Sequence, residues 1–501
     1  MWRSARRRPE RGLAPLVRGR AAEALAFAGA AVALSACIVP AGQASRPTPR
    51  AAIAQPRAAT APTATPSASP PASSSAPVRD DASLAEVPPT DELVPLAVPT
   101  SIEDPSGHAL AAFHAALQRA EAGTGQARIA YYGASHVASD MYTGVIRERL
   151  QARFGGAGPG FVLPAKPWRW YVHAGIDIAR TKGFKTLRVT AKDPRDDIYG
   201  YAGVALDTDP KRATSARIDL KGKPTREYEV EVRVLGQPGG GHVSIRTDVR
   251  PEWDRFPTHA TEHHILGLGN VFGCADNCPP RTGPRWIEIR THGDGPVRLF
   301  GVAIDGGPGV VLDTLGVPGA RAHDQLHWNE KGLLADLAWR HPDLVVLAYG
   351  TNESGDDVPI AEEEARVDAV VKRMRMATPW ASCLLVGPSD RPLKLPDGTY
   401  EPRPRTDEII DMQRRLARAH GCGFFDVAAF MGGPLSMLRW TATTPPLGGR
   451  DLVHFTRAGY ERLGHVLHDA LLEGYVPAAA VAPAAPTTPV APAAPVPPVA
   501  Q

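Results

Sequence analysis

Two distant segments of the chain carry the residue types of a serine-dependent acyl transfer. Ser135 follows Gly133 and Ala134 after an apolar, strand-like run, and Asp451 and His454 lie three residues apart late in the chain. A serine hydroxyl becomes a good nucleophile when an imidazole accepts its proton and a carboxylate holds that imidazole in one tautomer. We therefore predict a catalytic triad of Ser135, His454 and Asp451. The structural alternative is that Asp451 caps a helix and His454 is a surface histidine.

Two further segments, each placed after an apolar run, contain donors for a developing oxyanion. Gly319 follows the run at residues 310–312, and Asn352 follows the run at residues 344–349. In an open parallel sheet, ligands bind beyond the carboxyl ends of the strands, where these residues are expected. The N–H groups of Ser135 and Gly319 and the side-chain amide of Asn352 form the predicted oxyanion hole. Taken singly, Gly319 also suits a turn and Asn352 a helix N-cap.

The order of these segments resembles the SGNH/GDSL hydrolase family over most of residues 100–475. The matching residues are Ser135 in the first block, Gly319 in the second, Asn352 in the third, and Asp451 with His454 in the last. The resemblance is closest to the peptidoglycan O-acetylesterase branch, which has a β-domain between its first and second blocks.

Two positions depart from the family pattern. Ala134 stands where the family has an aspartate, and Glu353 stands where aspartate is more usual. Neither change touches the nucleophile, the base or the amide donor. We therefore expect them to affect substrate preference more than activity.

The resemblance implies a serine esterase that hydrolyses O-acetyl esters on a cell-envelope polysaccharide, in the first place peptidoglycan, through an acyl-enzyme and without a cofactor. One alternative is an O-acyltransferase that uses the same triad. Another is a non-catalytic glycan-binding envelope lipoprotein. A lipase of the α/β-hydrolase type shares the order Ser, Asp, His, but Ser135 does not lie in a Gly-x-Ser-x-Gly motif.

Residues 1–37 predict a lipoprotein signal peptide. A long arginine-rich segment precedes an apolar stretch at residues 25–34 that is short for a membrane span. The sequence Leu-Ser-Ala-Cys at residues 34–37 resembles a bacterial lipobox, which implies that Cys37 is lipidated. We therefore expect a lipid-anchored, extracytoplasmic protein of the bacterial cell envelope, in the periplasm or at the outer membrane of a Gram-negative cell. The alternative is an ordinary secretory signal.

The charge of the chain excludes a nucleic-acid footprint. The formal net charge is +3, but residues 1–36 hold seven arginines and two glutamates, so the rest of the chain carries −2. Nucleic-acid-binding domains present a basic patch or stripe, and a near-neutral chain with interspersed charges gives none. We expect a polysaccharide substrate and a membrane as partners, and no nucleic acid.

The composition changes along the chain predict six segments. They are the signal peptide and lipidation site at 1–37, an Ala/Pro/Ser/Thr linker at 38–88, the first part of the hydrolase domain at 100–164, an inserted β-sandwich at 165–308, the second part of the hydrolase domain at 309–476, and a Pro/Ala tail at 477–501. The linker and tail have almost no aromatic residues and cannot bury a core, so they are expected to be disordered.

The hydrolase parts alternate strands with helices, which predicts an α/β fold with a doubly wound, five-stranded parallel sheet. The expected helices lie at 108–122, 141–154, 322–340, 360–377, 405–420 and 456–472.

The inserted segment has a different pattern. Short alternating runs lie at 215–220, 228–234, 243–247, 286–289 and 297–300, and they predict an antiparallel sandwich. By family resemblance this domain is similar to a carbohydrate-binding module. Trp168, Trp170 and Tyr171 are candidates for stacking on sugars, with a place in the aromatic core as the alternative.

The chain has five cysteines, and Cys37 is assigned to the lipid. Cys274 and Cys278 are close enough to close a small loop, while Cys383 and Cys422 begin two successive predicted strands. Two disulfides are therefore plausible in an oxidising compartment, with buried thiols as the alternative for the second pair.

Three histidines near the first cysteine pair raise the question of a metal. They are His259, His263 and His264. Their spacing with the cysteines fits no zinc pattern, and an oxidising compartment favours the disulfide. No metal is predicted.

Overall fold

The computed structural model describes residues 101–190, 196–222, 228–269 and 283–477, which belong to one compact unit. The predicted signal peptide with Cys37, the linker at 38–88 and the candidate pair Cys274–Cys278 lie outside the described residues. So does all of the predicted tail except its first residue. None of the helices in the described part reaches the length and apolarity that crossing a membrane requires.

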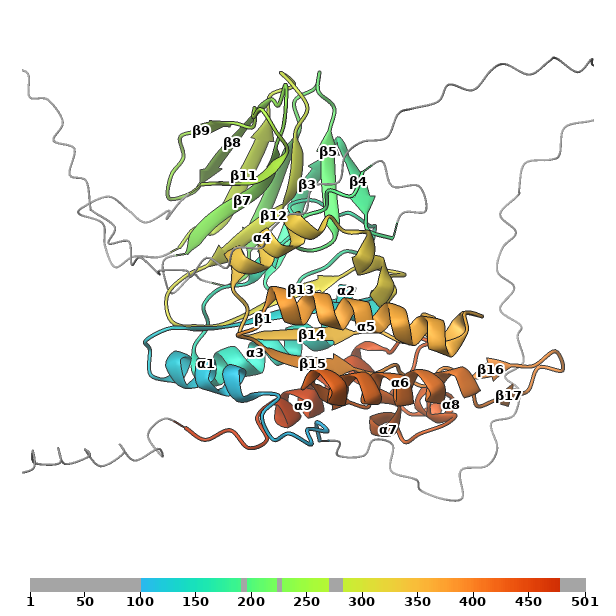
Figure 1. The fold of residues 1–501 in the computed structure, drawn as a ribbon. Helices are drawn as coiled ribbons and strands as arrows, with labels where there is room; N and C mark the ends of the chain where they lie inside the picture. Colours follow the sequence, from blue (N-terminus) through green and yellow to red (C-terminus); the bar gives the residue numbers. More distant parts are fainter. Residues whose placement is uncertain (1–100, 191–195, 223–227, 270–282, 478–501) are drawn as a thin grey trace, which may run out of the picture. The chain divides into compact units, whose positions relative to one another are not determined.

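The centre of the hydrolase domain is a parallel sheet with strand order β13-β1-β14-β15-β18 (Figure 1). Its strands are β1 (Gln126–Gly133), β13 (Gly309–Gly316), β14 (Leu344–Ala348), β15 (Ser382–Val386) and β18 (Gly423–Phe425). The five-stranded parallel sheet confirms the predicted fold class. The strand order reverses at β1, so the carboxyl ends of β13, β1 and β14 form the topological switch point where ligands bind in such sheets.

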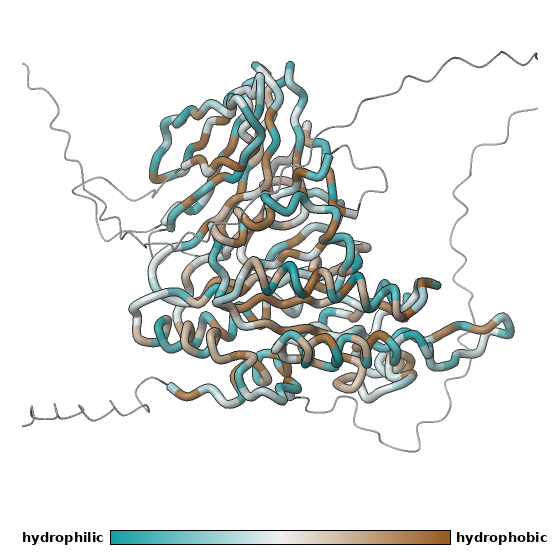
Figure 2. The backbone as a smooth tube through the Cα atoms, in the orientation of Figure 1, coloured by the Kyte–Doolittle hydropathy of each residue, from teal (hydrophilic) through white to brown (hydrophobic). Residues whose placement is uncertain are grey.

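Helices cover both faces of this sheet because alternate strand residues point to opposite sides. Ile129 and Tyr131 of β1 pack with α1 (Ala111–Glu121), α3 (Met141–Phe154) and α9 (Arg457–Leu471). Ala130 and Tyr132 belong to the core on the other side, which includes α4 (Glu330–Arg340), α5 (Ile360–Ala377) and α6 (Pro404–His420). Figure 2 shows hydrophobic residues concentrated along the strands between these helices.

One predicted helix is wrong in its extent. The segment 322–340 forms a short 3-10 helix, η1 (Ala322–His327), and then α4, with an extended Trp328 between them. Asn329 starts α4, since its side chain accepts a hydrogen bond from the Gly332 N–H at 3.0 Å. Short elements that we did not predict are α2 (Ser135–Ala138), η2 (Glu353–Gly355), α7 (Val427–Met431), α8 (Ser436–Ala442) and the hairpin of β16 (Leu393–Lys394) with β17 (Tyr400–Glu401).

The insertion consists of two antiparallel sheets, which confirms the predicted inserted β-domain. One sheet has the order β10-β7-β12-β5-β4, with β2 also paired to β12, and the other has the order β3-β6-β11-β8-β9. The first sheet contains β2 (Gly160–Val162), β4 (Phe184–Arg188), β5 (Val204–Thr208), β7 (Glu229–Gly236), β10 (His264–Leu268) and β12 (Arg298–Asp305). The second contains β3 (Ile176–Lys182), β6 (Ser215–Leu220), β8 (His242–Thr247), β9 (Asp254–Pro257) and β11 (Trp286–Thr291).

The insertion and the hydrolase part share one buried core and several polar contacts. The Arg340 guanidinium of α4 bonds the Asp313 carboxylate of β13 at 2.7 Å and the Asp305 carboxylate of β12 at 2.5 Å, and all three side chains are buried. The Tyr132 hydroxyl donates to the Tyr201 carbonyl at 3.2 Å. Removing one partner of such a buried ion pair is far more costly than breaking a surface pair, so the Arg340 contacts hold α4, β12 and β13 together.

The three aromatic candidates for sugar stacking have different environments. Tyr171 is buried, and its hydroxyl accepts a hydrogen bond from the Leu163 N–H at 3.0 Å. Trp168 is partly buried against the core, whereas Trp170 is 46% exposed. Tyr171 and Trp168 therefore belong to the aromatic core, the alternative given above.

Candidate active site

Ser135 lies at the end of β1, at the first position of α2. The turn requires a glycine at position 133, because a Cβ there would come within 2.3 Å of the Val137 side chain and 2.7 Å of the Ala348 carbonyl oxygen. The close approach of β1 to β14 and α2 thus directs the serine to the carboxyl edge of the sheet. That edge is where an α/β sheet of this order binds its ligands.

The structure brings Ser135, His454 and Asp451 together, although Ser135 and His454 are 319 residues apart. The distance between His454 Nε2 and Ser135 Oγ is 2.8 Å, and that between His454 Nδ1 and Asp451 Oδ2 is 2.6 Å. An ionised carboxylate only accepts hydrogen bonds, so Nδ1 carries the ring proton and Nε2 accepts from the serine hydroxyl. This chain of hydrogen bonds is the arrangement in which an imidazole can deprotonate a serine.

The loop that holds the acid and the base is fixed by its own backbone. Asp451 Oδ1 accepts hydrogen bonds from the N–H groups of Val453 at 3.1 Å and His454 at 2.9 Å, and Leu452 has a φ of 54°. Partial burial acts to raise the pKa of Asp451, but the hydrogen bonds from the His454 ring and from these N–H groups outweigh it, so the pKa lies below its usual value. Asp451 therefore stays ionised.

The helix after this loop is capped by another residue. The side chain of Thr456, not that of Asp451, accepts the capping hydrogen bond of α9, from the Gly459 N–H. The structural alternative for Asp451 as a helix cap is therefore wrong.

The two predicted oxyanion residues lie on adjacent loops. Gly319 is exposed in a turn, with a φ of 78°, which favours glycine. The Asn352 amide donates to the Ala320 carbonyl at 2.8 Å, and its side chain makes no capping bond to η2. Asn352 and Ser135 line one small pocket, whereas Gly319 is not among its lining residues.

That pocket has room for about 30 Å³, which corresponds to only one or two water molecules. Its walls are mostly apolar or small, contributed by the ends of β14 and β15 and by α3, α7 and α9. The lining residues include Tyr142, Ala348, Val386, Gly387, Val427, Phe455 and Leu463. A pocket of this size suits a small acyl group.

Glu353 is a functional candidate that sequence reasoning treated only as a family departure. Its buried carboxylate accepts hydrogen bonds from the Ala322 N–H at 2.8 Å and the Gly350 N–H at 3.0 Å. It therefore joins the loop that follows Gly319 to the loop that carries Asn352. Burial raises the pKa of Glu353 to about 7.

His136, next to the nucleophile, was also missed. Its side chain is partly buried, with Nε2 shielded from solvent, and the distance between its Nδ1 and the Tyr460 hydroxyl is 3.0 Å. Its centroid lies 5.3 Å from that of His454. Burial, with a smaller contribution from His454, lowers the pKa of His136 to about 3, so the ring is neutral and supports the base by packing. Only the position beside Ser135 signalled this role in the sequence.

The second cysteine pair and the histidines considered as metal ligands lie within the described residues. Cys383 and Cys422 form a disulfide with an S–S distance of 2.04 Å. Within the described ranges, no group of three or more His, Cys, Asp or Glu side chains is arranged to hold a metal ion. His259 and His264 are exposed, and His259 Nδ1 accepts a hydrogen bond from the Gly239 N–H at 3.1 Å.

Comparisons with known proteins agree with this fold. Residues 276–462 match the GDSL-like Lipase/Acylhydrolase family, a segment that contains Gly319, Asn352, Asp451 and His454. A solved peptidoglycan O-acetylesterase is similar over 75% of this chain and 99% of its own, with 24% identity and a TM-score of 0.62. No curated protein matches the chain.

Two further solved structures match with lower scores. The acetyl xylan esterase AlAXEase has 19% identity over 32% of this chain and 80% of its own, with a TM-score of 0.25. A family two carbohydrate esterase from Cellvibrio japonicus has 12% identity over 60% of this chain and 97% of its own, also with a TM-score of 0.25.

The family match over residues 276–462 and the five-stranded parallel sheet with its inserted β-domain support the same conclusion. The chain has an SGNH/GDSL-like hydrolase domain and is a carboxylic ester hydrolase.

Proposed function

We propose that this hydrolase removes O-acetyl groups from a cell-envelope polysaccharide, with peptidoglycan as its substrate, through an acetyl-enzyme on Ser135. The observation that carries the proposal is the continuous chain of hydrogen bonds from Ser135 Oγ through His454 to Asp451, at 2.8 and 2.6 Å. The small pocket beside Ser135 supports acetyl as the acyl group. The overall fold shared with a peptidoglycan O-acetylesterase supports the choice of polymer.

The first half of the reaction forms the acetyl-enzyme. Ser135 Oγ attacks the ester carbonyl carbon while His454 Nε2 takes the hydroxyl proton, and Asp451 stabilises the resulting imidazolium. The carbonyl oxygen becomes an oxyanion that accepts hydrogen bonds from the N–H groups of Ser135 and Gly319. The Asn352 amide has two N–H donors and uses one on Ala320, so the other serves the oxyanion.

His454 then gives that proton to the leaving sugar oxygen as the C–O bond breaks, which completes the acetyl-enzyme and frees the sugar as an alcohol. In the second half His454 takes a proton from a water molecule that attacks the carbonyl carbon of acetyl-Ser135, and it returns the proton to Ser135 Oγ as acetate leaves. Acid–base catalysis of this kind contributes roughly 10²–10⁴-fold to the rate. Solvent reaches the triad, because the side chains of His454 and Asp451 are 41% and 53% exposed. Water can therefore reach the acetyl-enzyme and act as the acceptor that hydrolysis requires.

We further propose that the protein is anchored in the cell envelope through Cys37, on the strength of the lipobox-like sequence at residues 34–37. An anchored esterase would meet its polymeric substrate at the membrane surface. Metabolic labelling with a palmitate analogue tests this placement, since the label should be lost in Cys37→Ala.

The test of the function is acetate release from O-acetylated peptidoglycan by the full chain. We expect rapid release from the polymer and slow hydrolysis of long-chain lipid esters, whose acyl groups exceed the pocket. Ser135→Ala should abolish release, and Ser106→Ala, in an exposed turn before α1, should retain it. Faster hydrolysis of long-chain esters than of the acetylated polymer would overturn the proposed substrate, and undiminished release by Ser135→Ala would overturn the mechanism.

A further inference from the structure

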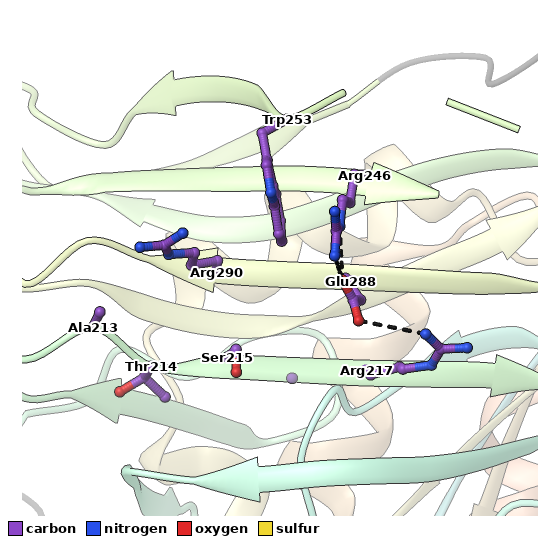
Figure 3. A pocket seen from close by; sticks show the side chains of 9 residues that line it. Ala213, Thr214, Ser215, Arg217, Arg246, Trp253, Glu288 and Arg290 are labelled. Carbon is purple, nitrogen blue, oxygen red and sulfur yellow. Dashed lines mark hydrogen bonds and ion pairs between the residues drawn. The ribbon is translucent and has the colours of Figure 1, made fainter. Parts of the chain in front are cut away.

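The insertion has an open pocket, which we call the cup, on the outer face of the sheet β3-β6-β11-β8-β9 (Figure 3). None of the residues Ser135, Asp451 and His454 lines it. Its volume is about 300 Å³, at the lower end of the range for small-ligand sites. Its walls are basic and aromatic. The lining side chains with charge or an aromatic ring are Arg217, Arg246, Trp253, Glu288 and Arg290.

One wall of the cup is a fixed row of charges across three strands. The register places Arg246 of β8 opposite Glu288 of β11, and Glu288 opposite Arg217 of β6. Glu288 bonds Arg246 at 2.6 Å and Arg217 at 3.4 Å. The Arg246 guanidinium also lies 4.4 Å from the centroid of the Trp253 ring. These contacts hold both guanidinium groups and the indole in place before any ligand arrives.

Arg290 differs from the other two arginines of the cup. Its neighbours across the sheet are Ser244 and Ser215, whose small side chains leave open space beside it. Arg290 is exposed, and it makes no ion pair with any carboxylate in the described part of the chain. In Figure 3 the Trp253 indole projects between Arg290 on one side and Arg246 with Glu288 on the other.

The cup therefore has an excess of positive charge at one defined place. Glu288 and Asp219 offset the charges of Arg246 and Arg217, since Asp219 bonds Arg217 at 2.8 Å. Among the described residues, no carboxylate pairs with Arg290. A guanidinium in an open cup is suited to a carboxylate, which it can bind through two parallel hydrogen bonds, and an adjacent indole offers an apolar surface to a sugar ring.

We propose that this cup binds a carboxylate-bearing saccharide, with Arg290 receiving the carboxylate and Trp253 packing against the sugar. The site goes beyond the proposed esterase function, because it does not involve Ser135 and can hold a strand that carries no O-acetyl ester. Two kinds of polymer offer this chemistry. One contains muramic acid, whose lactyl group ends in a free carboxylate wherever no stem peptide is attached, and the other contains uronic acids.

Binding by the full chain can be measured calorimetrically with three non-acetylated probes. They are the disaccharide N-acetylglucosaminyl-N-acetylmuramic acid, a tetramer of galacturonic acid, and uncharged chitotetraose. We expect binding of at least one charged probe, weaker binding at higher salt, and no comparable binding of chitotetraose. Arg290→Gln should weaken that binding about ten- to a hundred-fold, and Arg290→Lys should weaken it less. The matched control is Arg188→Gln in β4 of the other sheet, which removes the same charge outside the cup.

The charged probe that binds identifies the polymer. Equal binding of chitotetraose, equal losses in Arg290→Gln and Arg188→Gln, or no binding of either charged probe would overturn the proposal. None of the probes carries an ester, so a negative result leaves acetate release untouched. A loss of acetate release in Ser135→Ala likewise does not affect the binding measurement.

Discussion

The variant Glu353→Gln should show how much the free energy of unfolding falls when a carboxylate is buried between the two loops that carry the oxyanion donors. The Glu353 carboxyl is fully buried, and it accepts the N–H groups of Ala322 and Gly350 at 2.8 and 3.0 Å. Its pKa is raised from 4.5 to about 7 by burial. The folded protein thus binds this proton more tightly than the unfolded chain does, so ionisation of Glu353 opposes folding.

The sign and size of the pH effect follow from that difference. At a pH below about 4.5 the carboxyl is neutral in both states and costs nothing. As pH rises from about 4.5 to about 7, wild-type stability falls, because the unfolded chain loses the Glu353 proton in this interval while the folded protein keeps it. Above about pH 7 the carboxyl is ionised in both states, and the loss of stability is complete. At 1.36 kcal/mol per pKa unit, the full loss is roughly 3 kcal/mol, of which roughly 2 to 3 kcal/mol appears between pH 5 and pH 8.

Glutamine in this position has no such pH dependence. Its amide keeps one acceptor oxygen but leaves one of the two N–H groups without a partner, at a pH-independent cost of about 1–3 kcal/mol. The free energy of unfolding of Glu353→Gln, relative to wild type, should therefore improve by roughly 2 to 3 kcal/mol from pH 5 to pH 8.

Urea unfolding of both proteins at several pH values between 5 and 8 measures this change directly. A useful control is Glu364→Gln on α5, which removes a partly exposed carboxylate paired with Arg415 and should change stability by less than about 1 kcal/mol. A stability difference between wild type and Glu353→Gln that stays constant from pH 5 to pH 8 would refute the reasoning.

Two other variants test the site and its scaffold. Asn352→Ala removes one oxyanion donor and should lower kcat about 100- to 1,000-fold with little change in KM, because such a donor contributes about 2.7–4 kcal/mol to the transition state. Steady-state kinetics on a soluble acetyl ester check this, and a kcat within a few-fold of wild type would remove Asn352 from the mechanism. The double variant Cys383→Ala/Cys422→Ala opens a loop with a sequence separation of 39 and should lower the free energy of unfolding by roughly 2–4 kcal/mol. Unchanged urea midpoints for this variant would contradict the expectation that the disulfide stabilises the protein by restricting the conformations of the unfolded chain.

The strands of the central sheet were predictable because they are buried on both faces. Residues 344–348 form an uninterrupted apolar run, as a central parallel strand requires. The inserted sheets were predictable for the opposite reason, since strands such as β11 alternate between an inward Ile and an outward polar or aromatic side chain. In both cases the local hydrophobic pattern of the sequence indicates which strand residues are buried.

The break between η1 and α4 could not be read from the sequence because tertiary contacts cause it. The Trp328 indole N–H donates to the Tyr199 carbonyl at 3.3 Å, and the Asn329 N–H donates to the Asp197 carbonyl at 2.9 Å. Both partners belong to the insertion. Helical periodicity in residues 322–340 contains no information about them.

The candidate site was also predictable only in part. Ser135, His454 and Asp451 could be named from their types and order, and the structure places them within hydrogen-bonding distance, while their catalytic roles stay predictions. The positions of Glu353 and His136 depend on burial by segments far away in the chain. Their residue types alone did not indicate what they contact.

The central claim is that Ser135 is the nucleophile activated by His454, and covalent labelling tests it most directly. A fluorophosphonate probe, followed by peptide mass spectrometry, should place one adduct on Ser135, and labelling should fall sharply in His454→Ala. An enzyme that still releases acetate while Ser135 remains unlabelled, or that labels at a different serine, would contradict the account.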